Sequence, residues 1–133
     1  MLPRVPPTHV SDDLLDMLFA AIERGDIDAI DPLFADDIEV WHNTTNVALD
    51  KCGSLKLLSA WSKRVTEMHY EVLERRTYDG GAFQRHVIHG KANGTALQVP
   101  VCIVFHIAGD RITRIYEYLD GASVASVFAA QRD

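Results

Sequence analysis

Hydrophobic residues recur along the first half of the chain at the three- and four-residue spacing of helices that bury one face. The clearest stripe follows Ser11, which together with two acidic residues marks a helix start, and it runs to Gly25, a typical helix stop. Its members are Leu14, Met17, Leu18, Ala21 and Ile22. We therefore expect an amphipathic helix between Ser11 and Gly25.

Two further helices are expected before residue 67. Asp26 caps a short second helix that contains Pro32, which removes a backbone donor and keeps the helix short or bent. A third helix is expected over residues 54–66, where apolar side chains form a stripe and basic side chains occupy the opposite side. Between these two helices, residues 38–43 alternate as a strand.

The hydrophobic spacing shortens to two after about residue 70, which indicates strands. Four strands are expected, over residues 70–78, 83–91, 97–107 and 112–120. The hairpin signals between them are Asp79-Gly80-Gly81, Asn93-Gly94 and Ala108-Gly109-Asp110. From Gly121 on, the Ala- and Ser-rich sequence is expected to form a short helix or a loose tail.

This order of elements predicts an α+β fold: a curved antiparallel or mixed sheet forming a cone, with three helices packed on its concave side. A chain of 133 residues is long enough for one core and too short for two. We expect residues 1–10 to be a flexible arm and residues 11–133 to form a single domain.

Composition and charge argue against several classes of function. The net charge of −6 and the scarcity of clustered Lys and Arg argue against nucleic-acid binding. No apolar run approaches the ~20 residues of a membrane-spanning helix, and the start lacks a secretory signal pattern, so no membrane partner is expected. Cys52 and Cys102 follow no zinc-type spacing, which favours a cytoplasmic protein with reduced thiols, a single disulfide being the alternative.

Two segments carry a family resemblance. GDIDAIDPLFADDIEV, at residues 25–40, and GDRITRIYEYLD, at residues 109–120, resemble segments of the nuclear transport factor two superfamily, and within it of the SnoaL-like group. The better-known members of this group resemble polyketide cyclases, ketosteroid isomerase and limonene-type epoxide hydrolase. The resemblance implies the cone fold, a deep apolar pocket and no metal or other cofactor, but fold membership alone does not name a reaction.

The resemblance also implies roles for particular residues. The isomerase pattern places its general base at His42, but its two oxyanion donors fall on Leu18 and on or near Cys102, so steroid isomerisation is not expected. The cyclase and hydrolase patterns both place an acid/base carboxylate at Glu117. The second hydrolase motif corresponds to Gln84-Arg85-His86, which lacks the second carboxylate.

Strand alternation, with these positions as register marks, predicts which residues face the pocket. The expected catalytic residues are Glu117, His42 and His86. The expected ligand-binding residues are His106, Cys102, Val40, Ile88, Val104, Ile115, Leu18 and Trp61.

Glu117 interrupts an otherwise apolar strand face, between Ile115 and Leu119. Such a carboxylate is costly to bury unless it is paired, hydrogen-bonded or hydrated, and it usually marks a pocket. We expect Glu117 to be a general acid/base, with His42 and His86 as proton partners or hydrogen-bond donors. Histidines and a carboxylate could also ligate a metal, but HxH and HExxH spacings are absent and no metal is expected.

The function that these features favour is a small cofactor-independent enzyme acting on an apolar small molecule by proton transfer. Isomerisation or cyclisation beside a carbonyl is one version, and addition of water to an epoxide is the second. The alternative is a protein that binds a hydrophobic ligand without turnover, or a dimeric scaffold with the same fold. Trp41, Tyr116 and Tyr118 are expected on the outer face of the sheet, which predicts a homodimer through that face.

Overall fold

The computed structural model describes residues 10–129 of the chain. Helix α1 spans Val10–Glu23, with Asp12 and Asp13 in its first turn, where acidic side chains complement the exposed amides. Gly25 follows with a φ of +69°, a conformation that favours glycine and ends the helix. The predicted first helix is therefore confirmed.

The second predicted helix is a single turn followed by a tighter one. Helix α2 spans Ile27–Ile30 and is capped by Asp26, whose side chain accepts a hydrogen bond from the Ala29 backbone. Pro32 then lies inside a 3-10 turn, η1, at Asp31–Leu33. This turn leads directly into strand β1, Phe34–His42, which begins four residues earlier than expected.

The third helix begins earlier than predicted because its cap lies upstream of Ser54. Strand β2, Val47–Leu49, was not expected and precedes α3, which spans Lys51–Arg64. The Asp50 carboxylate accepts a hydrogen bond from the Gly53 backbone at 2.8 Å and caps α3. Ser54 is thus a residue within the first helical turn.

The rest of the described chain is mainly sheet. Strands β3 (Thr66–Tyr78), β4 (Gly81–Ala92), β5 (Thr95–Ala108) and β6 (Arg111–Leu119) follow one another through tight turns. Helix α4, Gly121–Ala129, follows β6, so the expected short helix is present over these residues, whereas residues 130–133 lie outside the described part of the chain. Asp120 accepts hydrogen bonds from the Ala122 backbone and the Ser123 hydroxyl, so it caps this helix.

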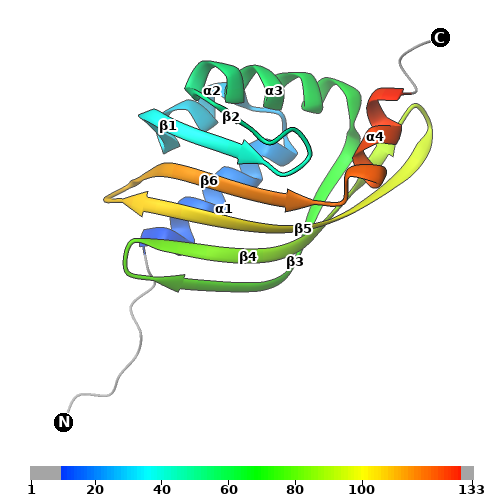
Figure 1. Ribbon diagram of the computed structural model, residues 1–133. Coiled ribbons are helices and arrows are strands. Elements are labelled where there is room, and N and C mark those ends of the chain that lie inside the picture. Colours follow the sequence, from blue (N-terminus) through cyan, green and yellow to red (C-terminus); the bar gives the residue numbers. More distant parts are fainter. Residues whose placement is uncertain (1–9, 130–133) are drawn as a thin grey trace.

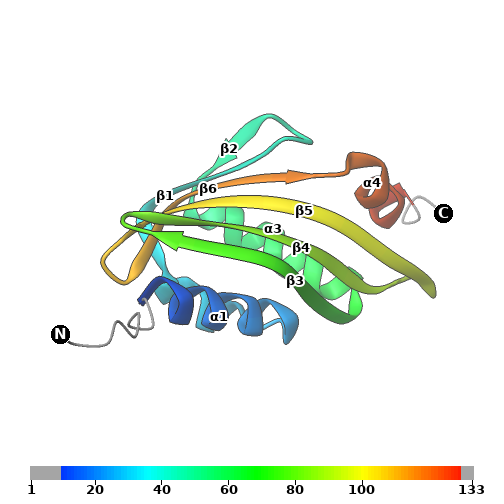
Figure 2. The same ribbon diagram turned by 90° about the horizontal axis from the view of Figure 1, so that it is seen from below.

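The six strands form one mixed sheet in the order β2-β1-β6-β5-β4-β3. Strand β1 runs parallel to β6, and the other neighbours are antiparallel. The sheet curves, and α1 and α3 lie along its concave face (Figures 1 and 2). The predicted fold, an α+β cone with helices on the concave side of a curved sheet, is confirmed.

The core lies between these helices and the concave face. It includes Leu15 and Leu18 from α1, Ile112 and Ile115 from β6, and Phe105 from β5, each no more than 5% exposed. In the described residues, no helix combines the length and the apolar character that crossing a membrane requires.

One part of the predicted strand register is wrong. On β5 the buried side chains are those of odd-numbered residues, Leu97 to Ile107, whereas Cys102 and His106 are exposed and Val104 is only partly buried. Because side chains alternate between the two faces, a shift of one residue moves a whole set to the other side. Cys102, Val104 and His106 therefore lie on the convex face, away from the concave face that was predicted for them.

Candidate active site

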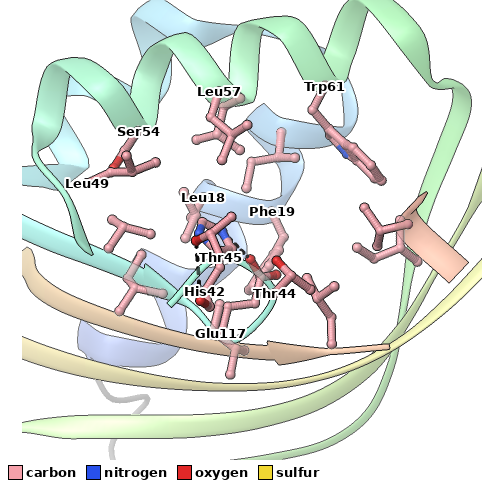
Figure 3. Close-up of a pocket in the computed structure, with 18 of the residues that line it drawn as sticks. Leu18, Phe19, His42, Thr44, Thr45, Leu49, Ser54, Leu57, Trp61 and Glu117 are labelled. Atoms are coloured by element: carbon pink, nitrogen blue, oxygen red, sulfur yellow. Dashed lines mark hydrogen bonds and ion pairs between the residues drawn. The ribbon is translucent and has the colours of Figure 1, made fainter. Parts of the chain in front are cut away.

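A cavity of about 520 Å³ lies between the concave face and helices α1 and α3 (Figure 3). Its lining is predominantly apolar. The apolar side chains are those of Leu18, Phe19, Ile22, Phe34, Val40, Val47, Leu49, Leu57, Leu58, Trp61, Ile88, Ile103, Ile115, Leu119 and Val124. The other lining residues are His42, Thr44, Thr45, Ser54, Tyr70 and Glu117. An apolar cavity of this size with a few polar groups is typical of a small-molecule site.

The exposed lining residues mark the mouth of the cavity. Thr44 and Thr45 lie in the loop between β1 and β2 and are exposed, as are Val47 on β2 and Leu57 on α3. Phe34, by contrast, is 2% exposed and belongs to the interior. A ligand would thus enter past the loop between β1 and β2 and reach an apolar interior.

His42 and Glu117 form a hydrogen-bonded pair in the wall of the cavity. They are direct partners in the parallel pairing of β1 with β6, so their side chains leave the sheet side by side on the concave face. His42 Nε2 lies 2.8 Å from Glu117 Oε1, and the two side chains are 14% and 17% exposed. The predicted proximity of these two residues is confirmed.

Asn43, which follows His42, joins the ends of β1 and β6. Its backbone N–H donates to the Glu117 carbonyl at 3.1 Å. Its side-chain amide donates to the Leu119 carbonyl at 3.1 Å and accepts from the Leu119 N–H at 2.9 Å. The amide side chain thus makes the two hydrogen bonds to the Leu119 backbone that a neighbouring strand would make, and it stabilises the register that places His42 beside Glu117.

Tyr70 on β3 is a polar lining residue that the sequence did not single out. Burial raises the pKa of its phenol well above the usual range, the negative charges of Glu117 and Glu23 raise it further, and a hydrogen bond with Trp61 opposes the rise. The phenol therefore stays protonated and presents a neutral hydroxyl at the cavity.

His86 lies on the concave face but does not line the cavity. It is 1% exposed, and its ring packs against the rings of Phe19 and Tyr70, with centroids 5.3 and 5.0 Å away. These two aromatic rings do line the cavity. The prediction that His86 faces the pocket is thus wrong, because bulkier neighbours cover it.

A chain of hydrogen bonds determines the protonation of His86. Arg75 Nε donates to Gln84 Oε1 at 2.7 Å, which turns the Gln84 amide nitrogen toward His86 Nδ1, 2.9 Å away. Nδ1 is therefore the acceptor, and the neutral ring carries its proton on Nε2. Burial lowers the pKa of His86 to about 4, and the Arg75 charge adds to this, against an opposing effect of Glu117.

The remaining sequence predictions divide between the two faces. Val40, Ile88, Ile115, Leu18 and Trp61 line the cavity together with His42 and Glu117. His106 instead packs its ring against Tyr116 on the convex face, 5.6 Å between centroids. Cys102 and Val104 share that face with it. Their predicted role in the pocket is corrected accordingly.

Three further polar residues at the cavity were missed. The Thr44 and Thr45 hydroxyls lie in a loop whose position depends on β2, a strand that the sequence pattern did not reveal. Ser54 was interpreted as part of a helix start, and its place inside α3 gives it a different environment. Across residues 10–129, the His, Cys, Asp and Glu side chains form no group of three or more that could hold a metal ion.

The chain matches one protein-family model. The SnoaL-like domain model matches residues 15–115, a segment that includes His42 and ends two residues before Glu117. No curated protein matches the sequence.

Solved structures with the same fold cover nearly all of the chain. IdmH from Streptomyces antibioticus, a candidate polyketide cyclase, is 16% identical with a TM-score of 0.77, over 91% of this chain and 99% of that protein. An epoxide hydrolase of the LEH-like type from M. tuberculosis is 18% identical with a TM-score of 0.75, over 94% and 93% of the two chains. At these identities the likeness concerns the fold alone.

The family match covers well over half of the chain, and the curved sheet, the helices on its concave face and the cavity agree with it. The chain belongs to the SnoaL-like domain family.

Proposed function

We propose that this protein is a small SnoaL-like enzyme that transfers protons on an apolar small molecule without a cofactor. Glu117 is the general base and acid, and His42 is its proton partner. The observation that carries this proposal is the 2.8 Å contact between His42 Nε2 and Glu117 Oε1 in the wall of an apolar cavity.

The proposed chemistry begins beside a carbonyl group. The Glu117 carboxylate removes a proton from the carbon next to the carbonyl, and the electron pair of the broken C–H bond moves into a carbon–carbon double bond as charge collects on the carbonyl oxygen. The neutral Tyr70 hydroxyl can donate a hydrogen bond to that oxygen. Return of the proton from Glu117 to another carbon completes an isomerisation. In a cyclisation the carbanion instead attacks a second carbonyl carbon of the same molecule, the C=O π bond there breaks, and its oxygen takes the proton from Glu117.

The walls of the cavity support an apolar substrate. Residues from α1, α3 and the concave face that surround the pair are mostly aliphatic or aromatic, and many of them are buried. An environment with little water strengthens the electrostatic effect of Glu117, His42 and Tyr70 on developing charge. A polar substrate would lose its hydration there without gaining enough hydrogen bonds.

The test is deuterium uptake from heavy water into a panel of cyclic enolisable ketones, measured with the wild-type protein and with Glu117→Gln. The expected result is a loss of exchange by a factor of about 10² to 10⁴ in Glu117→Gln, with ketone binding retained in a thermal-shift assay. The matched control is Glu39→Gln, because Glu39 pairs with Arg114 away from the cavity and should leave exchange unchanged. Equal exchange by wild-type protein and Glu117→Gln contradicts the proposal.

Addition of water to an epoxide is the second candidate, and it uses the same pair. The mouth of the cavity supports it, because the exposed Thr44 and Thr45 lie where water can approach His42 and Glu117. In this reaction Glu117 takes a proton from water as the water oxygen attacks an epoxide carbon and the C–O bond breaks, and the proton then passes to the released oxygen, which gives a diol and restores the carboxylate. A panel of terpenoid-like epoxides distinguishes it from ketone chemistry. Ligands that raise the melting temperature without any turnover would instead indicate a binding protein.

We further propose that the protein forms a homodimer through the convex face. Trp41 packs against Tyr116 and Tyr118, with ring centroids 6.3 and 5.2 Å apart, and Tyr118 remains 47% exposed. Aromatic residues gathered on an open sheet face favour association. Light scattering should give the mass of a dimer for wild-type protein and of a monomer for Tyr118→Lys, whereas a wild-type monomer contradicts this part of the proposal.

A further inference from the structure

Ser54 carries a buried hydroxyl with no hydrogen-bond partner in the described part of the chain. The residue is 3% exposed, and its Oγ is one of two side-chain polar atoms there that are buried and unpaired, the other being His86 Nε2. Unlike His86, Ser54 lines the cavity. An unpaired buried hydroxyl is costly, so its presence at a cavity wall calls for a partner from outside the protein.

The position of Ser54 sets it apart from the other polar groups at the cavity. His42, Glu117 and Tyr70 belong to the sheet, whereas Ser54 belongs to the first turn of α3 (Figure 3). The other α3 residues lining the cavity are Leu57, Leu58 and Trp61, so Ser54 is the hydroxyl that α3 presents there. The cavity thus has polar groups on two opposing walls.

We infer that Ser54 is a specificity-determining residue that hydrogen-bonds a second oxygen atom of the ligand. The inference rests on the proposed function and narrows its substrate class. The ligand is an apolar, ring-containing molecule that carries one carbonyl at the His42–Glu117 pair and a further carbonyl or hydroxyl oxygen that reaches α3. A pure hydrocarbon tail leaves the Ser54 hydroxyl unpaired and binds more weakly.

The alternative to a ligand partner is a hydrogen bond from the Ser54 hydroxyl to a carbonyl of its own helix. A serine inside a helix often turns its hydroxyl toward the carbonyl four residues earlier, which here is that of Asp50. That carbonyl already accepts the Ser54 backbone N–H at 2.9 Å, and the Ser54 hydroxyl makes no bond to it. Ser62 on the same helix shows the difference, because its hydroxyl donates to the Ser59 carbonyl at 2.9 Å.

The experiment compares matched pairs of ketones that differ by one oxygen. The probes are decalone and decalindione, cyclohexylcyclohexanone and bicyclohexanedione, and androstanone and androstanedione, which place the second oxygen at increasing distances from the first. Dissociation constants are measured by calorimetry for Glu117→Gln, which blocks turnover, and for the same protein with Ser54→Ala or Ser62→Ala added. Binding is thus measured independently of catalysis.

The inference predicts that at least one diketone binds about three- to tenfold more tightly than its monoketone, the range expected for one hydrogen bond. Ser54→Ala should abolish this gap, and Ser62→Ala should preserve it. A panel in which no diketone binds more tightly, or a Ser54→Ala protein that keeps the gap, overturns the inference. If the difference in affinity between diketone and monoketone depends on Ser54 but the wild-type protein shows no ketone exchange, the inference about Ser54 is supported and the proposed function is contradicted.

Thermal unfolding without ligand gives a second readout that needs no probe. Both substitutions have the same effect on helix propensity, so their difference reports the lost hydroxyl interaction. The melting temperature of Ser54→Ala should equal or exceed that of wild type, whereas Ser62→Ala should fall below Ser54→Ala. A clear loss of stability in Ser54→Ala shows that the hydroxyl has a structural partner, and overturns the inference.

Discussion

The concave face carries two histidines in very different surroundings. His42 is bonded to a carboxylate in the wall of the cavity, and its side chain is 14% exposed. His86, on β4, is covered by Phe19 and Tyr70 and accepts a hydrogen bond from the Gln84 amide. The two residues share a type and a face of the sheet, yet one can reach a ligand and the other cannot.

The comparison shows that the hydrogen-bond partner of a histidine determines whether its ring can take part in proton transfer. A carboxylate can exchange a proton with an imidazole, so the His42–Glu117 pair is suited to proton transfer. An amide has no proton to give up at ordinary pH, and with its pKa at about 4 His86 is neutral in the physiological range. We therefore expect the Arg75–Gln84–His86 chain to stabilise the fold, whereas the proposed proton transfer uses the His42–Glu117 pair.

The largest expected effect on stability comes from breaking the buried chain at its centre. Gln84 is 0% exposed, and Gln84→Leu leaves both Arg75 Nε and His86 Nδ1 without their partner. At about 2 kcal/mol for each unpaired buried group, the free energy of unfolding should fall by about 4 kcal/mol. Urea denaturation measures this, and Gln98→Leu, at an exposed position on β5, should stay within about 0.5 kcal/mol of wild type. Similar losses in both variants would remove the assigned structural role of the chain.

Acid should destabilise the fold through His86. The pKa of His86 is about 4 in the folded protein against an ordinary value of 6.5, so the unfolded chain binds more protons between these pH values. The stabilising contribution is complete above pH 6.5 and is lost as the pH falls toward 4, by about 3 kcal/mol. His86→Asn cannot titrate and keeps an acceptor for Gln84, so the difference in unfolding free energy between wild type and His86→Asn should shrink over this range. A difference that does not change with pH contradicts the assignment.

Loss of the His42 imidazole should lower the rate of ketone exchange, whereas loss of a histidine outside the cavity should not. His42→Ala removes the partner of Glu117 and should lower ketone exchange by a factor of about 100, the lower end of acid–base contributions. His106→Ala, on the convex face, serves as the control and should retain the wild-type rate. Wild-type exchange by His42→Ala would show that Glu117 acts without an imidazole partner.

The smallest effect is expected at Asn43, which holds the pair in register. Asn43→Ala loses two hydrogen bonds to the Leu119 backbone and should cost about 1 to 2 kcal/mol of unfolding free energy. Asn43→Asp keeps an acceptor for the Leu119 N–H and loses the donor, so its thermal stability should fall between wild type and Asn43→Ala. Equal stability of all three proteins would mean that backbone pairing alone sets the register of β1 and β6.

The sequence was sufficient for much of the fold and for the centre of the candidate site. Alternation places Ile115 and Glu117 on one face of β6, although the pairing with β5 shifts register between Ile112 and Arg114, so this alternation begins only after that irregularity. The position of His42 follows from β1 in the same way. Both residues lie in the second half of a short strand, after its register irregularity, where local pattern and tertiary contact agree.

The β5 register could have been predicted from the same kind of pattern. Its odd-numbered residues are uniformly apolar, whereas its even-numbered ones include Gln98, Cys102 and His106. The prediction instead aligned Cys102 with a pocket residue of the related family, and this wrongly placed the even-numbered residues of β5 on the concave face. The intrinsic pattern of a half-buried strand was the better guide.

Other features depend on contacts that no local pattern encodes. His86 is on the expected face, but its exclusion from the cavity depends on Phe19 in α1 and Tyr70 in β3 packing over it. Tyr70 and Ser54 line the same cavity only because α3 packs over the sheet. Distant segments decide these positions, so the tertiary structure was needed to find them.

The most direct test of the central assignment is a long-range proton–nitrogen NMR spectrum of the histidine rings at neutral pH. The ring signals of His42 should shift in Glu117→Gln and again when a cyclic ketone is added, because the pair is joined and lines the ligand cavity. Those of His86 should show the neutral tautomer protonated at Nε2 and shift little with either change. A His42 ring that responds to neither Glu117→Gln nor the ketone contradicts the account.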